Sequence, residues 1–368
     1  MKTIRIKSIS FLAILALLIF ACQKDEDSSD TGPTASLDET PYILEYGDLP
    51  EPILPDDNAL TEQKVKLGKM LFFEKMLSKD GSQSCAGCHR QPDGFSDTAR
   101  LSIGVEGLPG KRQAMAVFNM AWNTNEFFWD GRAHLLRDQS LKPIQDPLEM
   151  NETLENVVAK LSASRMYTDQ FIRAFGDKVV TPERMSLAME QFMLSIVSNK
   201  SKYDEYLAGN ATLTASEERG MNLFNTEYNP SFPNLSGADC AHCHSGPNFE
   251  NDKYMNNGLD TDAGITDIGR EMVTKQPMDK AKFKVPSLRN IELTPPYMHD
   301  GRFKTLEEVV DHYDNGLKFS TTIDPALENT RQQGLMLDDQ DKSDLVAFLK
   351  TLTDYSMGNN PEYADPFK

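Results

Sequence analysis

Two motifs of the form Cys-x-x-Cys-His constrain this chain more than any other feature: Cys85-Ala86-Gly87-Cys88-His89 and Cys240-Ala241-His242-Cys243-His244. In such a box the two thiols can add to the vinyl groups of one haem, and the histidine becomes an axial ligand of the iron. Zinc sites, redox dithiols and structural disulfides are the alternatives, but none of them needs a histidine directly after the second cysteine. The sequence therefore predicts two covalently bound haems c, with His89 and His244 as proximal ligands.

The formal net charge of −18 over 368 residues limits the partners of this chain. Nucleic acid and anionic membrane surfaces attract basic proteins, so the negative charge argues against nucleic acid as a partner and against electrostatic binding to an anionic membrane surface. An acidic surface is compatible with a small basic electron donor. The length allows about two domains, each with its own hydrophobic core.

The first 21 residues are typical of an export signal. Cations precede an apolar stretch that ends at Phe20 and is too short to span a bilayer. The tetrapeptide that ends at Cys22 resembles a bacterial lipobox, in which Cys22 becomes the lipidated first residue; cleavage that leaves a free cysteine is the alternative. We expect a lipoprotein signal peptide at 1–21, a tether at 22–58, and an exported, lipid-anchored protein in the periplasm or at the outer membrane. Residues 23–27 resemble a surface-display signal, which adds the cell surface as an option.

The chain contains an internal repeat. The pattern Gly-x-x-Leu-Phe precedes each haem box, at 68–72 and at 220–224, and an Asp-Gly-Arg turn follows each box. This order predicts two related cytochrome c-type helical domains, at 59–208 and 209–368. We expect each domain to carry one haem, with both haems facing a shared interdomain interface.

Helical periodicity dominates the segments between these motifs, and we find few convincing strands. Four threonines directly precede helical patterns and are expected to act as N-caps: Thr61, Thr181, Thr214 and Thr305. The sequence therefore predicts a mainly α fold.

The far side of each iron decides between peroxide chemistry and electron transfer, because an open position binds peroxide and a filled one does not. Residues 90–128 contain no histidine, and their soft ligands, Met115 and Met120, lie in an apolar stretch typical of core packing. We therefore expect the first haem to be open. Farther on, Glu149 is a candidate to move a proton between peroxide oxygens; a solvated helix-entry residue is the alternative.

Two further residues belong to this candidate site. The amide of Gln139 can orient a bound peroxide. Trp129 takes the position that His299 has in the second copy of the repeat. A buried indole there can relay electrons between the irons, or it can simply pack in the core, as most tryptophans do.

The chain resembles the bacterial di-haem cytochrome c peroxidase family, which includes MauG, from about residue 56 to its C-terminus. The resemblance rests on the two haem boxes and on four further motifs in the same order: Phe-Trp-Asp-Gly-Arg at 128–132, Pro-Leu-Glu-Met at 147–150, Lys-Val-Pro-Ser-Leu-Arg-Asn at 284–290 and Pro-Pro-Tyr-Met-His-Asp-Gly-Arg at 295–302. It implies an N-terminal peroxidatic haem and a C-terminal electron-transfer haem, with Trp129 between them. It also implies that Gln139 and Glu149 act in the peroxide pocket.

Two departures from the family pattern affect the irons. Many peroxidases of this family carry a histidine that blocks the first iron until the partner haem is reduced, and Val105 stands at that position here. We therefore expect the ferric enzyme to need no reductive activation. Fourteen residues after His299 the usual methionine ligand of the second haem is replaced by Tyr313, as in MauG-type proteins. A phenolate there would lower the potential; His312 and Met298 are the alternative ligands.

A third departure concerns calcium. The family places a calcium ion between the haems, and the carbonyl ligands correspond to Thr294 and Pro296. The family's asparagine ligand corresponds to Gln113, whose side chain is longer. The resemblance thus implies one Ca²⁺ with altered affinity.

Three functions remain open. The first is a peroxidase that reduces hydrogen peroxide to water at the N-terminal haem, with electrons relayed from the C-terminal haem. The second is a MauG-like oxidase that uses peroxide-derived high-valent iron to modify a partner protein. The third is a non-enzymatic electron carrier. The expected partners are hydrogen peroxide and a small soluble donor (a cytochrome c or cupredoxin) or a protein substrate, and family members often form homodimers.

Overall fold

The computed structural model describes residues 35–368, which form one compact unit. The predicted signal peptide, Cys22 and the first part of the tether lie outside these residues. None of the helices within 35–368 combines the length and the apolar character that crossing a bilayer requires.

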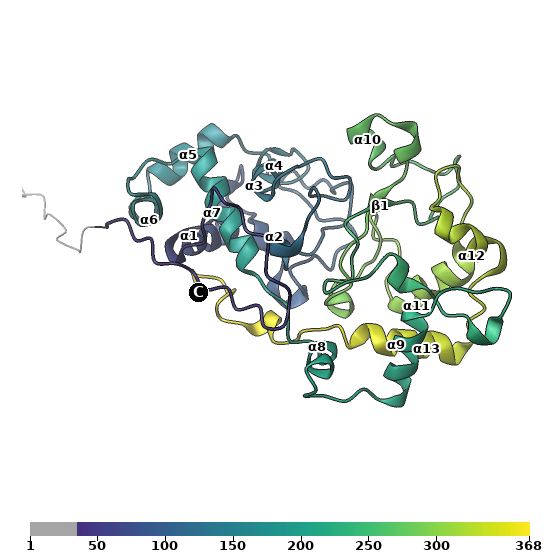
Figure 1. Cartoon of the computed structure of the whole chain (residues 1–368). Coiled ribbons are helices and arrows are strands. Elements are labelled where there is room, and N and C mark those ends of the chain that lie inside the picture. Colours follow the sequence, from purple (N-terminus) through teal and green to yellow (C-terminus); the bar gives the residue numbers. More distant parts are fainter. Residues whose placement is uncertain (1–34) are drawn as a thin grey trace, which may run out of the picture. The chain divides into compact units, whose positions relative to one another are not determined.

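Helices make up most of the regular structure, which confirms the prediction of a mainly α fold (Figure 1). Each of the four predicted threonine caps accepts a hydrogen bond from the backbone N–H three residues farther on. Strands β1 (Tyr254–Met255) and β2 (Phe283–Lys284) pair antiparallel.

The first half of the described chain contains α1 (Glu62–Phe73), α2 (Cys85–Cys88), α3 (Leu136–Ser140), α4 (Lys142–Gln145), α5 (Leu154–Ser162), α6 (Arg165–Phe175) and α7 (Pro182–Ser195). The second half contains α8 (Lys202–Leu207), α9 (Ala215–Asn225), α10 (Glu271–Thr274), α11 (Leu306–Asp311), α12 (Glu328–Gln333) and α13 (Asp339–Lys350). The helix before each haem box packs on a later helix of the same half: α1 on α7, and α9 on α13.

Glycine allows both of these helix pairs to approach closely. A Cβ atom on Gly68 would lie 1.9 Å from the carbonyl oxygen of Ala188, and one on Gly220 would lie 1.9 Å from that of Asp344. Any larger residue would force the helices apart. The internal repeat predicted from the sequence is therefore confirmed in the packing.

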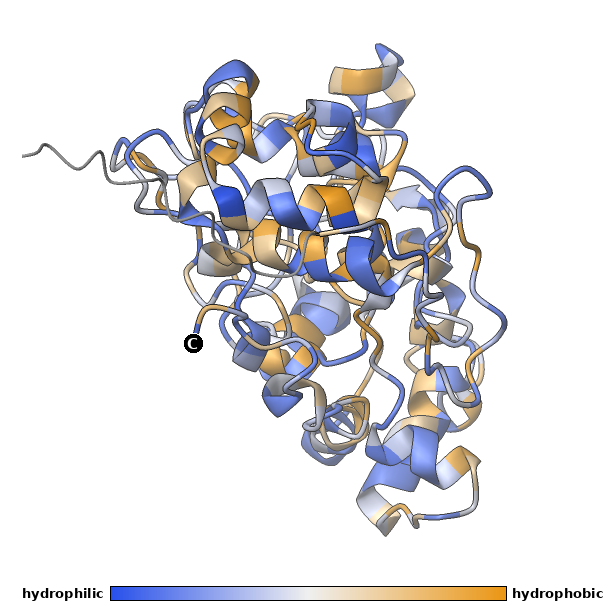
Figure 2. Ribbon diagram, turned by 90° about the vertical axis from the view of Figure 1, so that its left-hand side faces the viewer, coloured by the Kyte–Doolittle hydropathy of each residue, from blue (hydrophilic) through white to orange (hydrophobic). Residues whose placement is uncertain are grey.

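Each half has its own aromatic core. In the first core Phe72 packs edge-on against Phe192, with ring centroids 5.3 Å apart. In the second core Phe224 packs in the same way against Phe348, at 5.2 Å. Hydrophobic and hydrophilic residues both occur along the helices (Figure 2), and the longer helices, such as α7 and α13, bury many of their hydrophobic residues. The predicted domain boundary near residue 208 stays a prediction, because Tyr363 of the C-terminal tail joins the first core.

Two equivalent backbone hydrogen bonds connect the repeats. The N–H of Gln113 donates to the carbonyl of His299, and the N–H of Lys284 donates to the carbonyl of Trp129, both at 2.8 Å. Gln113 lies six residues before Asn119, and Lys284 lies six residues before Asn290. Each copy of the repeat therefore donates a backbone hydrogen bond to the other copy from the equivalent position.

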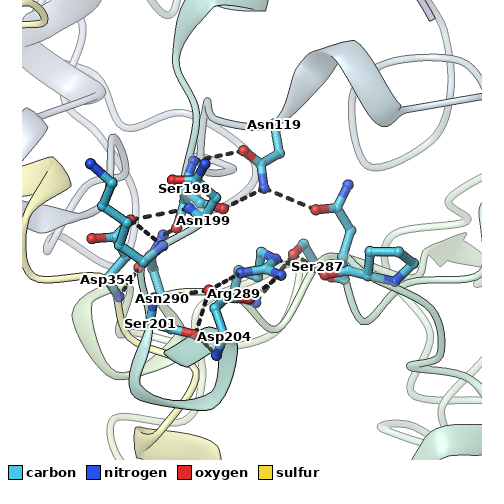
Figure 3. Close-up of polar contacts among 12 residues, drawn as sticks. Asn119, Ser198, Asn199, Ser201, Asp204, Ser287, Arg289, Asn290 and Asp354 are labelled. Carbon is cyan, nitrogen blue, oxygen red and sulfur yellow. Dashed lines mark hydrogen bonds and ion pairs between the residues drawn. The ribbon is translucent and has the colours of Figure 1, made fainter. Parts of the chain in front are cut away.

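The segment that joins the two halves is held at Ser198 (Figure 3). The side-chain amide of Asn119 donates to the carbonyl of Ser198 at 3.0 Å and accepts from its N–H at 2.8 Å. The amide of Asn290 donates to the Ser198 hydroxyl at 2.9 Å and accepts from the N–H of Asp354 at 2.8 Å. Nearby, Arg289 forms a bidentate ion pair with Asp204 of α8.

Candidate functional site

A cavity of about 1130 Å³ extends between the two haem boxes and is lined by residues of both halves. It is larger than the roughly 300–1,000 Å³ typical of a pocket for one drug-sized ligand. Its walls include most of the residues predicted from the sequence: Cys88, His89, Gln113, Trp129, Gln139, Glu149, Cys240, Cys243, His244, Thr294, Pro296 and Tyr313. Cys85 does not line it and packs against the first core.

Both histidines predicted as proximal ligands lie within hydrogen-bond distance of a backbone carbonyl. His89 Nδ1 lies 3.1 Å from the carbonyl oxygen of Phe95, and His244 Nδ1 lies 3.0 Å from that of Phe249. If each Nδ1–H donates to its carbonyl, each Nε2 keeps a free lone pair, as an iron ligand requires. Burial lowers the pKa of both imidazoles, that of His244 to about 4, so both stay neutral.

These residues fit two covalent haems. The thiols of Cys85, Cys88, Cys240 and Cys243 are free of disulfides. Each thiol pair lies beside a neutral histidine, and the walls of the cavity are largely apolar. The side chain of His242, inside the second box, is 51% exposed and lies near Asp239, as expected of a surface residue and not of an iron ligand.

The candidate peroxide pocket lies on α3 and on the loop after α4. Gln139 and Glu149 line the same cavity as His89, so the structure brings together the three residues that the sequence assigns to this site. Burial raises the pKa of Glu149 to about 7, Asp146 adds to this effect and Arg132 opposes it. The carboxyl can therefore exchange a proton close to neutral pH, whereas a solvated glutamate could not.

The loop around Val105 forms a wall of this pocket. The backbone N–H of Val105 donates to the carbonyl of Glu149 at 2.8 Å. A Cβ atom on Gly104 would lie 2.1 Å from the carbonyl oxygen of Leu148, so the loop packs directly on the segment that carries Glu149. Gly104 lines the cavity, but Val105 is not among the lining residues. The side chain at the family's blocking position thus lies outside the cavity wall.

Trp129 is buried between the halves, with 9% of its surface exposed. Its indole N–H donates to the carbonyl of Gln113 at 2.9 Å, and its ring packs against Phe283. The repeat-related residue contacts the same ring, because His299 stacks on Phe283 with ring centroids 3.6 Å apart and planes 9° apart. Trp129 is thus both a core residue and a cavity-lining residue.

The three candidate distal ligands of the second haem gather around Asn257. Its side-chain amide donates to Met298 Sδ at 3.2 Å and reaches the Tyr313 hydroxyl at 3.5 Å. His312 Nε2 lies 3.0 Å from the Asn257 carbonyl. A π-helical turn over His312–Gly316 follows α11, and Tyr313 and Met298 line the cavity whereas His312 does not. Burial raises the pKa of Tyr313 to about 12, so binding ferric iron would require the loss of its proton.

The residues implied for calcium, Gln113, Thr294 and Pro296, all line the cavity. The Gln113 amide donates to the Ser96 hydroxyl at 3.0 Å and to the Asp97 carbonyl at 3.3 Å. Its oxygen remains available as a ligand. Within the described residues no cluster of three or more histidine, cysteine or acidic side chains could hold a metal ion.

Sequence reasoning missed several polar residues of the cavity wall. Asn257, Glu250 and Lys284 all line the cavity. For Lys284 a signal existed, because it occupies the repeat position of Gln113. Asn257 had none, since its partners are 41 and 56 residues away along the chain.

Comparison with known proteins agrees with this geometry. The family model for di-haem cytochrome c peroxidase matches residues 62–212. The chain is 33% identical over 301 residues to the methylamine utilization protein MauG of Methylophilus methylotrophus, covering 81% of this chain and 84% of that protein. It is 35% identical over 321 residues to the cytochrome c551 peroxidase of Nitrosomonas europaea, covering 86% and 87%. The chain belongs to the di-haem cytochrome c peroxidase family.

Solved structures of this di-haem family show the same fold. A MauG-like protein associated with microbial copper homeostasis superposes with a TM-score of 0.81 at 32% identity, covering 89% of this chain and all of that one. The di-haem peroxidase BthA of Burkholderia thailandensis matches with a TM-score of 0.67 over 86% of this chain and 94% of that one, at 24% identity, which shows the fold alone. The family implies two c-type haems, and the prediction of a cytochrome c peroxidase-type oxidoreductase is confirmed at the level of the family.

Proposed function

We propose that this protein reduces hydrogen peroxide to water at the N-terminal haem box, with electrons that enter at the C-terminal box. The observation that carries the proposal is the placement of Glu149 and Gln139 in the cavity that His89 lines. The reaction consumes one peroxide, two electrons and two protons and forms two waters. Bound haem would supply the iron that accepts peroxide and the centre that stores an electron.

The protein residues handle protons and orientation. The Glu149 carboxylate can take a proton from one peroxide oxygen and return it to the other, because its pKa lies near 7. The amide of Gln139 can hold the peroxide for this transfer. Trp129 lies between the two boxes, where an indole can relay electrons.

The ferric state is expected to react without prior reduction. Val105 cannot bind iron, and its backbone is fastened to the Glu149 carbonyl. Met115 and Met120 pack partly buried against hydrophobic clusters and also line the cavity, and we expect packing roles for both. No histidine lies within residues 90–128 to block the site.

A second function is favoured by one observation, the presence of Tyr313 in the cavity wall of the second box. A phenolate ligand would stabilise oxidised iron. Such a protein could act as a MauG-like oxidase that modifies residues of a partner protein. The names of the two relatives, MauG and cytochrome c551 peroxidase, are compatible with both functions.

The deciding experiment is peroxide consumption by the fully ferric, haem-loaded protein. Rapid reaction without added reductant supports the open N-terminal site, and catalytic turnover with a reduced small cytochrome or cupredoxin then supports the peroxidase. A long-lived oxidant that cross-links a co-purified protein supports the MauG-like oxidase. Reaction only after reduction contradicts the open site, and no reaction in either state leaves an electron carrier.

We also propose that the protein is exported and lipid-anchored at Cys22, in the periplasm, at the outer membrane or at the cell surface. The lipobox-like sequence supports this assignment. Wild-type protein should then fractionate with membranes, and Cys22→Ala should not yield lipidated protein. Recovery of the wild type entirely in the soluble fraction would contradict the anchor.

Calcium binding and dimer formation are further proposals, which rest on the resemblance to the family. Metal analysis of the purified protein tests the Ca²⁺ assigned to Gln113, Thr294 and Pro296. Ultracentrifugation tests the homodimer.

A further inference from the structure

The two halves of the repeat differ in the charge of two residues: the first half has neutral side chains where the second half has ionisable ones. In the first half, Ser96 follows Phe95, and its hydroxyl accepts a hydrogen bond from the Gln113 amide at 3.0 Å. In the second half the residue after Phe249 is Glu250, and the position of Gln113 is taken by Lys284. A neutral pair beside the first haem box thus corresponds to an ionisable pair beside the second.

Lys284 is held deep between the halves. Only 6% of its surface is exposed, and its ammonium donates to the side chains of Asn123 and Asn125 and to the Glu126 carbonyl at 3.3 Å. These acceptors come from the other half of the chain. The cation is therefore fixed in place, because a buried charge must keep its hydrogen-bond partners.

Glu250 lies close to the second proximal histidine. Its backbone N–H donates to the carbonyl of Ser245, the residue that follows His244, at 3.0 Å. Its side chain lines the cavity between the boxes, as Lys284 does. Glu250 follows His244 by six residues, so this carboxyl belongs to the surroundings of the second box.

The surroundings of Glu250 bring the pKa of its carboxyl close to neutral pH. Burial raises the pKa of Glu250 to about 7, with Asp252 acting in the same direction, whereas Lys284 and a hydrogen bond from Asn248 oppose the rise. Burial lowers the pKa of Lys284, while Glu250, Asp252 and Glu126 raise it. These are the charged groups that face the pair from the loops of both halves.

We propose that Glu250, which lines the cavity together with Lys284, is a redox-linked proton site of the second haem. An electron placed on the second iron by a one-electron donor protein adds negative charge to the cavity. The carboxylate of Glu250 then takes one proton from solvent, and it returns that proton when the electron moves on to the first site. Iron is reduced and reoxidised, the donor is oxidised, and the net charge of the cavity stays constant. The proposal rests on the second box holding a haem, and it does not require peroxide turnover.

The test is a spectroelectrochemical titration of the haem-loaded protein across neutral pH. One proton taken up per electron shifts a midpoint potential by about 59 mV for each tenfold change in proton concentration. We expect the potential of the second haem to fall with rising pH around pH 7, with a slope that approaches this limit. In Glu250→Gln this slope should be lost, while the potential of the first haem keeps its own pH dependence.

Two further measurements guard against misfolding and indirect effects. Glu218→Gln removes the same charge from an exposed position of α9 and should keep the wild-type slope. A pH-indicator dye in weakly buffered solution should report proton uptake when the wild type is reduced, and less uptake in Glu250→Gln. A wild-type potential that does not change with pH, or an unchanged slope in the folded Glu250→Gln variant, would overturn the proposal. Because none of these readouts uses peroxide, a failed peroxidase assay would leave the result intact.

Discussion

Asn119 and Asn290 occupy equivalent positions of the repeat, and both hydrogen-bond to Ser198 in the segment that joins the halves (Figure 3). Both have left-handed backbone conformations, with φ of 52° and 57°. Both are also almost completely buried. One residue of the connecting segment therefore links the two copies of the repeat.

Replacing Asn119 with alanine should destabilise the protein strongly. It removes hydrogen bonds to the Ser198 backbone and to Asn248, and leaves buried polar groups without partners. Each such group costs about 1–3 kcal/mol, so we expect a loss of at least about 3 kcal/mol in denaturant unfolding. Asn119→Gly relieves the left-handed conformation but lacks the amide, and should recover only about 1 kcal/mol. Asn210→Ala, at an exposed position, is the control. Equal stability of all three variants would contradict a role for the amide.

Replacing Glu149 with glutamine should slow the reaction with peroxide by about 10²–10⁴-fold. In the wild type the carboxylate form accepts the proton, so the rate should rise with pH through about 7 and then level off. Glu149→Gln should lack this rise. Stopped-flow measurement on ferric protein checks both points, with Glu155→Gln, an exposed residue of α5, as the control. A wild-type rate that falls with rising pH would refute proton acceptance by this group.

A histidine placed at the family's blocking position should not close the N-terminal site. The Val105 backbone is fastened to the Glu149 carbonyl, and its side chain is not part of the cavity wall. Ferric Val105→His should therefore react with peroxide at a rate within about twofold of the wild type, since an iron bond would require the loop to leave its packing on Leu148. EPR spectra of the ferric protein check this result. A new low-spin bis-histidine signal would show that the loop can move.

Replacing Tyr313 with methionine should raise the potential of the second haem. A thioether favours ferrous iron, whereas a phenolate favours ferric iron. Axial ligands span about 0.8 V in potential, so we expect a rise on the order of 0.1 V or more. Tyr297→Phe removes another cavity-lining phenol, which donates to the Ile291 carbonyl, and should leave the spectrum unchanged. If Met298→Leu instead alters the spectrum and Tyr313→Met does not, Met298 is the ligand.

The amino-acid sequence by itself determined the parts of this protein that depend on local spacing. A thiol pair and the histidine after it are set by five adjacent positions, so both haem boxes could be read directly. Threonine caps and the helix-packing glycines repeat at matching positions, so the mainly α fold and the repeat followed. Gln139 and Glu149 line the same cavity as His89, and their shared role in one site stays a prediction, because the spacing alone left Glu149 ambiguous.

Only the tertiary structure decided relationships between residues far apart in the chain. It distinguished Tyr313 from its neighbour His312, because Tyr313 lines the cavity whereas His312 does not, although both side chains contact Asn257. It also brought Lys284 to Asn123 and Asn125, and two equivalent asparagines to Ser198. Such contacts leave no pattern in the local sequence. Buried polar groups must form hydrogen bonds once water is excluded, and only the long-range packing of the chain determines which distant groups become partners.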